Sequence, residues 1–194
     1  MTIKEMELDD DDLGVFALSI VDVPAIKENF IHLRDEPKRF ELAKVDDEKR
    51  LLIGPALIPN KPIFRRDNEE DEGYYIYFKP SVIEKAAHNF IRKSMHLNHT
   101  LMHEEKLEGM SVVETWLIED SERDKSTAYG FNLPKGTWML SVHVDNEKVW
   151  NEQVKSGKVK GFSIEAYFSE KNAKPDPVKD AMRQLCDSIE KAAL

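Results

Sequence analysis

The chain has 194 residues, enough for one domain with or without a tail, and a single cysteine, which excludes an internal disulfide and fits a reducing compartment. Its net charge of −9, from 28 Lys and Arg against 37 Asp and Glu, disfavours nonspecific binding to nucleic acid, which requires phosphate-neutralising cations. No apolar run reaches the roughly 18 residues of a membrane span, and the acidic N-terminus lacks the apolar core of a signal peptide, so we expect no membrane association.

Strand signals dominate the first 80 residues. Residues 14–23 (GVFALSIVDV) are apolar and rich in β-branched side chains, and Pro24 ends the run. Residues 40–45, 50–58 and 74–79 predict further strands. Pro55 indicates an edge or a bulge, because proline cannot donate to a strand ladder.

The apolar period then changes to that of a helix. Residues 81–92 carry apolar side chains at helical spacing, and Ser81 and Glu84 have the spacing of a capping box. Residues 94–109 (SMHLNHTLMHEEKLEG) show no period and are interpreted as a loop. A strand over 110–119 and a charged loop over 120–127 follow.

The last third alternates strand, helix and strand. Residues 137–144 predict a strand, and Asp145 is placed to cap a helix that stops at Gly157. The segment GKVKGFSIEAYF, residues 157–168, reads as a strand that carries Ser163. Asp176 and Pro177 would begin a C-terminal helix. These elements predict an α+β fold with a mostly antiparallel core flanked by helices.

Three histidines crowd the predicted loop, and three interpretations compete. His96, His99 and His103 have a spacing that resembles a zinc-ligand set, but the His-Glu-x-x-His pattern and a cysteine pair are both missing. They could be solvated loop residues without a role. One of them could also be a general base, since a neutral-range imidazole suits that task. Spacing alone does not choose among them.

Ser163 is a candidate nucleophile, and the same position could hold an inert small polar residue. The Gly-x-Ser is not the Gly-x-Ser-x-Gly elbow, because position 165 is Glu. A serine hydroxyl becomes nucleophilic when an adjacent base takes its proton. Without further information, the residues predict an α+β domain, and a hydrolase with a Ser–His pair is one function that this domain could have.

The order of the blocks LMHEE, VVETW, PKGTWML, VDNEKVW and KSGKVKGFSIEAYF resembles the tailed-phage prohead serine protease family, of the type found in Gram-positive phages and prophages. It is distantly similar to the herpesvirus assemblin proteases. ALSIVDVPAIKENF and GPALIPNKPIFRRD add to the resemblance. It implies a β-barrel-like, assemblin-like core over residues 14–170, after an acidic arm over 1–13 and before a linker and C-terminal helix over 171–194.

The resemblance also implies a function. The protein would be an endopeptidase inside the phage procapsid, in the host cytoplasm, that cleaves scaffold protein, extensions of the major capsid protein and itself. It implies no cofactor and no metal, and it allows a homo-oligomer. Two alternatives stay open: a non-catalytic capsid or scaffold component that keeps the fold, and a zinc hydrolase built on the three histidines.

Carried over by position, the nucleophile falls on Ser163 and the base on His103, eleven residues before Glu114. His99 remains a rival for the base. The family's third residue matches Ala17, which cannot orient an imidazole. Glu114 is therefore the expected third catalytic residue, with Asp22 as its substitute.

Overall fold

The computed structural model describes residues 2–9, 12–27, 31–32, 49–66, 68 and 72–171. Over these residues the fold is strand-rich with a few helices, which confirms the predicted α+β class. The predicted strand over 40–45 and the predicted C-terminal helix lie outside the described residues. No helix among the described residues is both long and apolar enough to cross a membrane.

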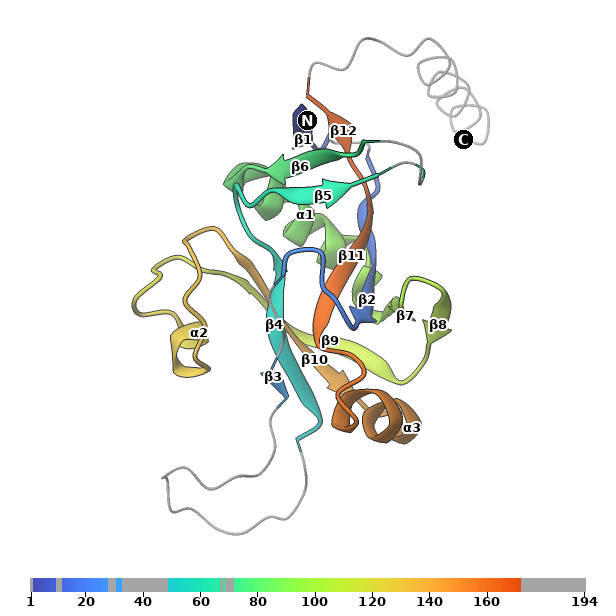
Figure 1. The fold of residues 1–194 in the computed structure, drawn as a ribbon. Helices are drawn as coiled ribbons and strands as arrows, with labels where there is room; N and C mark the ends of the chain where they lie inside the picture. Colours follow the sequence, from blue (N-terminus) through green and yellow to red (C-terminus); the bar gives the residue numbers. More distant parts are fainter. Residues whose placement is uncertain are drawn as a thin grey trace, which may run out of the picture.

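The strands form three four-stranded sheets (Figure 1). The β1 sheet has the order β12 (Ser169–Glu170), β1 (Thr2–Glu7), β6 (Tyr74–Phe78), β5 (Ile63–Arg65). The β10 sheet has the order β3 (Ile31–His32), β4 (Leu51–Leu57), β10 (Trp138–Val144), β9 (Met110–Leu117). The β2 sheet has the order β11 (Gly161–Tyr167), β2 (Gly14–Val21), β7 (His99–Leu101), β8 (Glu105–Leu107).

The pairing is mostly antiparallel, as predicted: within the described strands only β1–β6 and β2–β7 are parallel. The described strands do not close into a barrel, so the expected barrel-like core is instead a set of three open sheets. The helical elements are α1 (Pro80–Arg92), the 3₁₀ helix η1 (Met95–Leu97), α2 (Lys125–Ala128), α3 (Glu147–Val149) and the π-helix η2 (Trp150–Lys155).

Helix α1 packs its apolar stripe into the core. Ile83, Ala86, Ala87 and Phe90 are buried at the spacing of one helical face, and α1 contacts β2, β9 and β10. The Phe90 ring meets fully buried Trp138 edge-on, with 5.5 Å between ring centroids. Helix α1 thereby joins the β2 sheet, which carries Ser163, to the β10 sheet.

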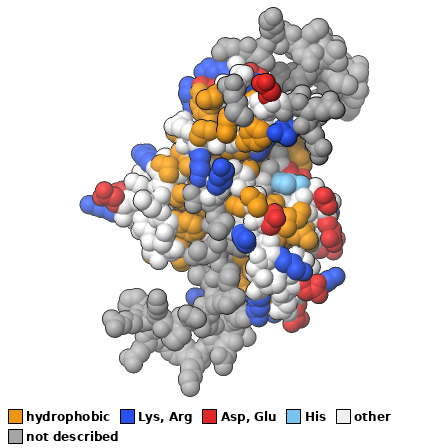
Figure 2. All heavy atoms as spheres, in the orientation of Figure 1, with side chains coloured by type: hydrophobic (Ala, Val, Ile, Leu, Met, Phe, Trp, Pro, Cys, Tyr) orange, Lys and Arg blue, Asp and Glu red, His pale blue; other side chains and the backbone are white. Residues whose placement is uncertain are grey.

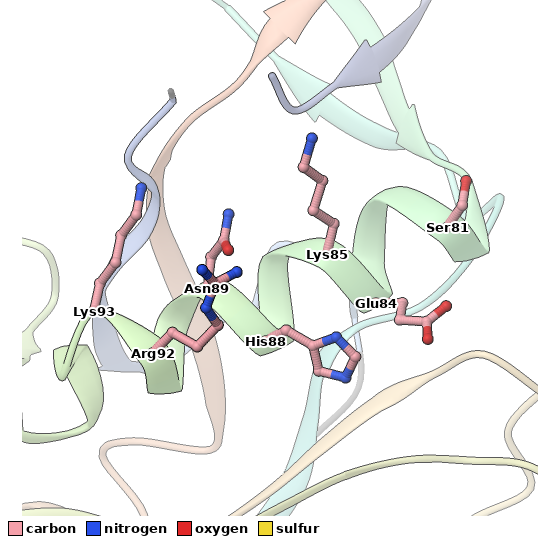
Figure 3. Close-up of a pocket in the computed structure, with 7 residues that line it drawn as sticks. All are labelled: Ser81, Glu84, Lys85, His88, Asn89, Arg92 and Lys93. Carbon is pink, nitrogen blue, oxygen red and sulfur yellow. The ribbon is translucent and has the colours of Figure 1, made fainter. Parts of the chain in front are cut away.

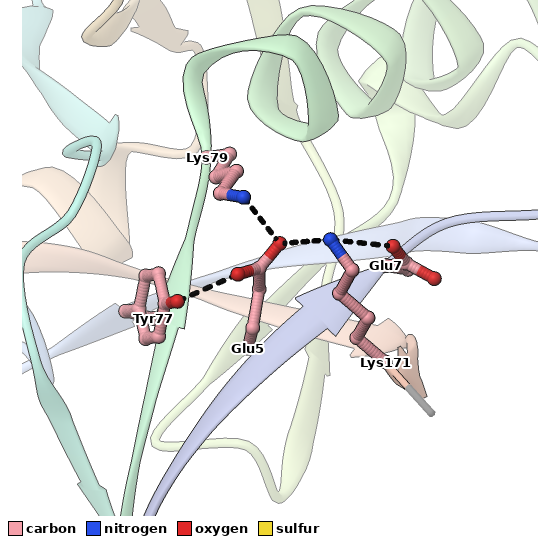
Figure 4. Close-up of polar contacts among 5 residues, drawn as sticks. All are labelled: Glu5, Glu7, Tyr77, Lys79 and Lys171. Atoms are coloured by element: carbon pink, nitrogen blue, oxygen red, sulfur yellow. Dashed lines mark hydrogen bonds and ion pairs between the residues drawn. The ribbon is translucent and has the colours of Figure 1, made fainter. Parts of the chain in front are cut away.

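The predicted acidic N-terminal arm contains strand β1, which a carboxylate network fixes in its sheet (Figure 4). Glu5 accepts hydrogen bonds from the Tyr77 hydroxyl at 2.6 Å and from the ammonium groups of Lys79 and Lys171 at 2.9 and 3.0 Å. These contacts lower the pKa of Glu5 to about 2, and the hydrogen bond from Tyr77 contributes more than either ammonium group. A hydrogen bond from β6 and two ion pairs, to the residues that follow β6 and β12, thus hold β1 in its sheet.

Several local predictions hold. Strands β2, β4, β6, β9, β10 and β11 lie where the apolar patterns placed them. The register of β10 against β4 shifts next to Pro55, which confirms the predicted bulge. Gly157 follows η2 with φ of +73°, the left-handed conformation expected where a helix stops.

Two predicted helix caps are wrong. Helix α1 begins at Pro80 after Lys79, without a side-chain cap, because a proline at the first helical position has no amide hydrogen to satisfy. In the second helical segment the cap is Asn146, whose Oδ1 accepts from the Val149 amide at 3.1 Å, while the Asp145 amide bonds to the Gly109 carbonyl. The observed cap position lies two residues before Ser81 in α1 and one residue after Asp145 in the second segment.

The predicted loop over 94–109 is also wrong, and this correction matters for the site. The segment contains η1 and the hairpin of β7 and β8, and β7 adds to the sheet as a parallel neighbour of β2. Three-residue strands leave almost no periodic signal, and this pairing joins segments about 80 residues apart. The charged loop over 120–127 likewise ends in the short helix α2.

Candidate active site

Ser163 lies near the start of β11, at one edge of the β2 sheet. Its Cα pairs with that of Ser19 on β2, so the two side chains share one face of the sheet. Ser163 is only 7% exposed, so a substrate would have to reach it through the small pocket that this residue lines. Its hydroxyl forms no hydrogen bond with any described residue, which leaves the oxygen available for chemistry.

His103 occupies the tip of the β7–β8 hairpin. Met102 and His103 have φ of +52° and +64°, and the Glu104 amide bonds to the Leu101 carbonyl at 3.0 Å. Two central residues with positive φ define a tight hairpin turn of the type that favours Asn and Gly. Methionine and histidine therefore hold this conformation at an energetic cost, as residues at functional sites often do.

Two hydrogen bonds hold the tip of this hairpin against β2. The Met102 amide donates to the Ile20 carbonyl at 3.1 Å, and the His103 amide donates to the Ser19 hydroxyl at 3.0 Å. Ser19 is therefore a link between the two candidate residues: its Cα pairs with Ser163, and its oxygen accepts from the His103 backbone.

A carboxylate of β11 contacts the His103 imidazole. Glu165 Oε1 lies 3.2 Å from His103 Nδ1 and also accepts a hydrogen bond from the Thr100 hydroxyl. Glu165 is two residues beyond Ser163, so both side chains point to the same face of the sheet. Glu165 pairs with Ala17, whose small side chain leaves room for the contact between Glu165 and Thr100 over β2.

This arrangement contains the parts of a serine hydrolase site. A carboxylate that accepts from Nδ1–H leaves Nε2 of a neutral imidazole as the proton acceptor. The Ser163 hydroxyl and the His103 ring do not hydrogen-bond to each other here, and such contacts often tighten only with substrate bound. On one sheet face the fold therefore places a serine, a histidine and a carboxylate that contacts the histidine, which are the residue types of such a site.

His99, the rival base, lies in a different environment. It is 1% exposed, and its Nε2 donates to the His96 carbonyl at 3.1 Å. Burial lowers the pKa of His99 to about 4, because the surrounding side chains cannot solvate an imidazolium. Such a buried, weakly basic imidazole suits a structural role better than proton transfer at neutral pH.

The expected third residue, Glu114, lies on β9 in the β10 sheet. Its carboxylate accepts from the Ser141 hydroxyl at 3.0 Å and pairs with Lys125, whose ammonium group lowers the Glu114 pKa. Its substitute Asp22 accepts from the neighbouring Val23 amide at 2.7 Å. Among the described residues the carboxylate at His103 is Glu165, which differs from the sequence expectation.

The three histidines of the zinc interpretation do not converge. The Nε2 atom of His99 is used by a backbone carbonyl, and the ring of His103 faces Glu165. Within the described ranges no group of three His, Cys, Asp or Glu side chains is placed to hold one metal ion.

A larger hollow lies elsewhere, along one side of α1 (Figure 3). It measures about 500 Å³ and is lined by charged and polar side chains of this helix. Two of its cations already bind backbone carbonyls of the N-terminal segment, Lys85 that of Leu8 and Lys93 that of Asp12. None of Ser163, His103 and Glu165 lines it, so hollow size alone would misplace the site.

Sequence reasoning missed Glu165, Ser19 and Thr100. One signal was present: in GFSIE the serine and the glutamate are two residues apart on a predicted strand, so they had to share a face. No signal in the sequence pairs that strand with β2 or places the histidine hairpin beyond it.

The turn at His103 supports a stability prediction. We expect Met102→Gly to raise the free energy of unfolding by about 1 kcal/mol, because glycine adopts positive φ without steric cost. Urea unfolding of both proteins measures the change, and Leu101→Gly, in the strand just before, is the control that should destabilise. An equal or lower stability for Met102→Gly would contradict strain at this turn.

A model of the family described as "Putative phage serine protease XkdF" matches residues 39–171, which is more than half of the chain. The matched segment contains His103, Ser163 and Glu165, whereas β2 lies before it. No curated protein and no solved structure matches the chain significantly.

Proposed function

Since the chain belongs to the XkdF family of phage serine proteases, we propose that it is the endopeptidase of prohead maturation. In this proposal it acts inside the procapsid, in the host cytoplasm, on scaffold protein and on extensions of the major capsid protein. Self-cleavage and assembly into a homo-oligomer belong to the same proposal. The reaction uses no metal and no cofactor.

The proposed chemistry is acyl transfer through Ser163. His103 Nε2 takes the hydroxyl proton as the oxygen attacks the peptide carbonyl, and backbone amides hold the oxyanion. The imidazolium then gives that proton to the leaving amine, which departs as the acyl-enzyme forms. Water, deprotonated by His103, attacks the ester; the resulting C–O bond cleavage releases the acid and returns the proton to Ser163.

One observation carries this proposal: the contact of 3.2 Å between His103 Nδ1 and Glu165, on the sheet face that also bears Ser163. A carboxylate there fixes the tautomer and stabilises the imidazolium formed in the reaction. Glu165 is thus proposed as the positioning residue, in place of Glu114.

A second candidate is a non-catalytic capsid or scaffold component that keeps the protease fold. The low exposure of Ser163 and the missing hydrogen bond between Ser163 and His103 favour it. This candidate predicts a protein that binds capsid components and never forms a covalent adduct at Ser163.

Labelling with a peptidyl phosphonate, followed by intact-mass measurement, separates the two candidates. For the enzyme we expect one adduct, lost in Ser163→Ala and His103→Ala and kept in Ser141→Ala, a buried serine of the β10 sheet. His88→Ala, an exposed histidine on α1, is the control for the base. An adduct that survives Ser163→Ala, or no adduct in the wild type, would contradict the proposed mechanism.

The substrate assignment has its own experiment. Co-expression with the major capsid protein encoded by the same phage genome should shorten that protein, and Ser163→Ala should abolish the change. If the capsid protein keeps its mass although the enzyme reacts with the phosphonate, the protease function stands and the capsid protein is rejected as its substrate.

A further inference from the structure

A small pocket lies directly beside Ser163, where the three sheets meet. Its wall includes three successive residues of β11, Phe162, Ser163 and Ile164, so it runs along the strand's backbone edge rather than one face. In the described sheets β11 has a strand neighbour on one side only, namely β2. The pocket therefore borders the edge of β11 that has no strand neighbour in the described sheets, beside the Ser163 hydroxyl that would attack a peptide carbonyl.

Arg65 is the one charged residue that lines this pocket; apart from Ser163, its other lining residues are apolar. Arg65 ends β5, two residues after buried Ile63, so both side chains share a face and both line the pocket. The arginine and the serine thus come from different sheets and border the same small space.

The Arg65 guanidinium has no carboxylate partner among the described residues. Its hydrogen bond goes to the carbonyl of the preceding residue, Phe64, at 3.0 Å. Burial lowers the pKa of Arg65, and the nearby Tyr74 side chain offsets part of this effect, so the guanidinium carries a partly desolvated charge. A partly buried cation without a carboxylate partner among the described residues is costly, and an incoming carboxylate would offset that cost.

We propose that this pocket receives the substrate side chain that precedes the cleaved bond, and that Arg65 selects an acidic residue there. This inference rests on the proposed protease function and names its substrate class. The cleaved sequences would carry glutamate or aspartate at that position.

The pocket is narrow. Its free space is about 10 Å³, roughly the room of one water molecule, so a bulky apolar side chain would have to displace buried walls. An aspartate or glutamate side chain also exceeds this space, and in this proposal a rearrangement of the long Arg65 side chain makes room for it. On the outer surface, hydrophobic side chains gather over β5 and β6, with Lys and Arg side chains below them (Figure 2). Between these two strands, the ring centroids of Phe64 and Tyr75 lie 5.6 Å apart.

Two phosphonates that differ in one group test the inference. One carries a glutamate-like side chain next to the phosphorus and the other the glutamine-like amide, so size is constant and charge changes. We expect wild-type protein to react about 10- to 100-fold faster with the acidic probe, the range of a charge-assisted hydrogen bond. Arg65→Gln should bring the ratio of rates close to one, and Arg65→Lys should give an intermediate ratio.

Arg66→Gln is the matched control, because Arg66 is exposed, lies next in the chain and does not line the pocket. It should keep the wild-type ratio. Equal rates with both probes in the wild type, or an unchanged ratio in Arg65→Gln, would overturn the inference about Arg65. Neither result would contradict the proposed protease function. Failure of both probes to label Ser163 would instead reject the proposed function, and the inference with it.

Discussion

Glu165→Gln is expected to lower kcat for peptide cleavage by about 10²- to 10⁴-fold, with KM changed less than about threefold. The amide can still reach His103 Nδ1, but it supplies no negative charge and permits the wrong tautomer. Because Glu165 acts through the imidazole and not on the substrate, the loss should fall on kcat. Steady-state kinetics on a cleaved capsid-derived peptide measure both constants.

Glu114→Gln is the matched control for this prediction. Its carboxylate lies on β9 with Ser141 and Lys125 as partners, so we expect kcat within about threefold of the wild type. The opposite result, a large loss in Glu114→Gln and a small one in Glu165→Gln, would restore Glu114 as the positioning residue. Urea unfolding of both variants shows whether either loss comes from unfolding.

The stability of the protein is expected to fall by about 2 kcal/mol between pH 7 and pH 5 because of His99. The pKa of His99 is about 4 in the folded chain, and its ordinary value is 6.5. Between these values the unfolded chain binds more protons, so acid favours unfolding. The full contribution is present above pH 6.5 and is lost as the pH falls toward 4. Urea unfolding at several pH values measures this slope.

His99→Gln should remove most of this slope while it keeps a donor for the His96 carbonyl, the partner of Nε2. The absolute stability of the variant can differ from the wild type without affecting the comparison, since only the pH dependence is used. The pH window lies above the range in which Glu5, with its pKa of about 2, loses its contribution. A slope that persists in His99→Gln would show that other groups cause it, and His88→Gln should leave it in place.

The elements that depend on local physics can be predicted from the amino-acid sequence alone. Alternating or continuous apolar runs located β2, β4, β6, β9, β10 and β11, and the helical period located α1, because side-chain periodicity depends only on neighbours in the chain. Pro55 predicted a bulge because proline lacks an amide hydrogen, and Gly157 predicted a helix end because glycine adopts positive φ. The sequence also contained Ser163 and Glu165 at a spacing that places them on one strand face.

Which carboxylate contacts which histidine follows from the three-dimensional packing of the sheets. Glu114 and Glu165 are both strand residues, and nothing local says that β9 belongs to the β10 sheet and β11 to the β2 sheet. The hairpin of His103 depends on the parallel pairing of β7 with β2, and its tip depends on Ser19, 84 residues away in the chain. The burial that makes His99 a weak base is likewise a product of packing. Contacts between distant segments follow from strand order and register, which the pattern of any single segment does not encode.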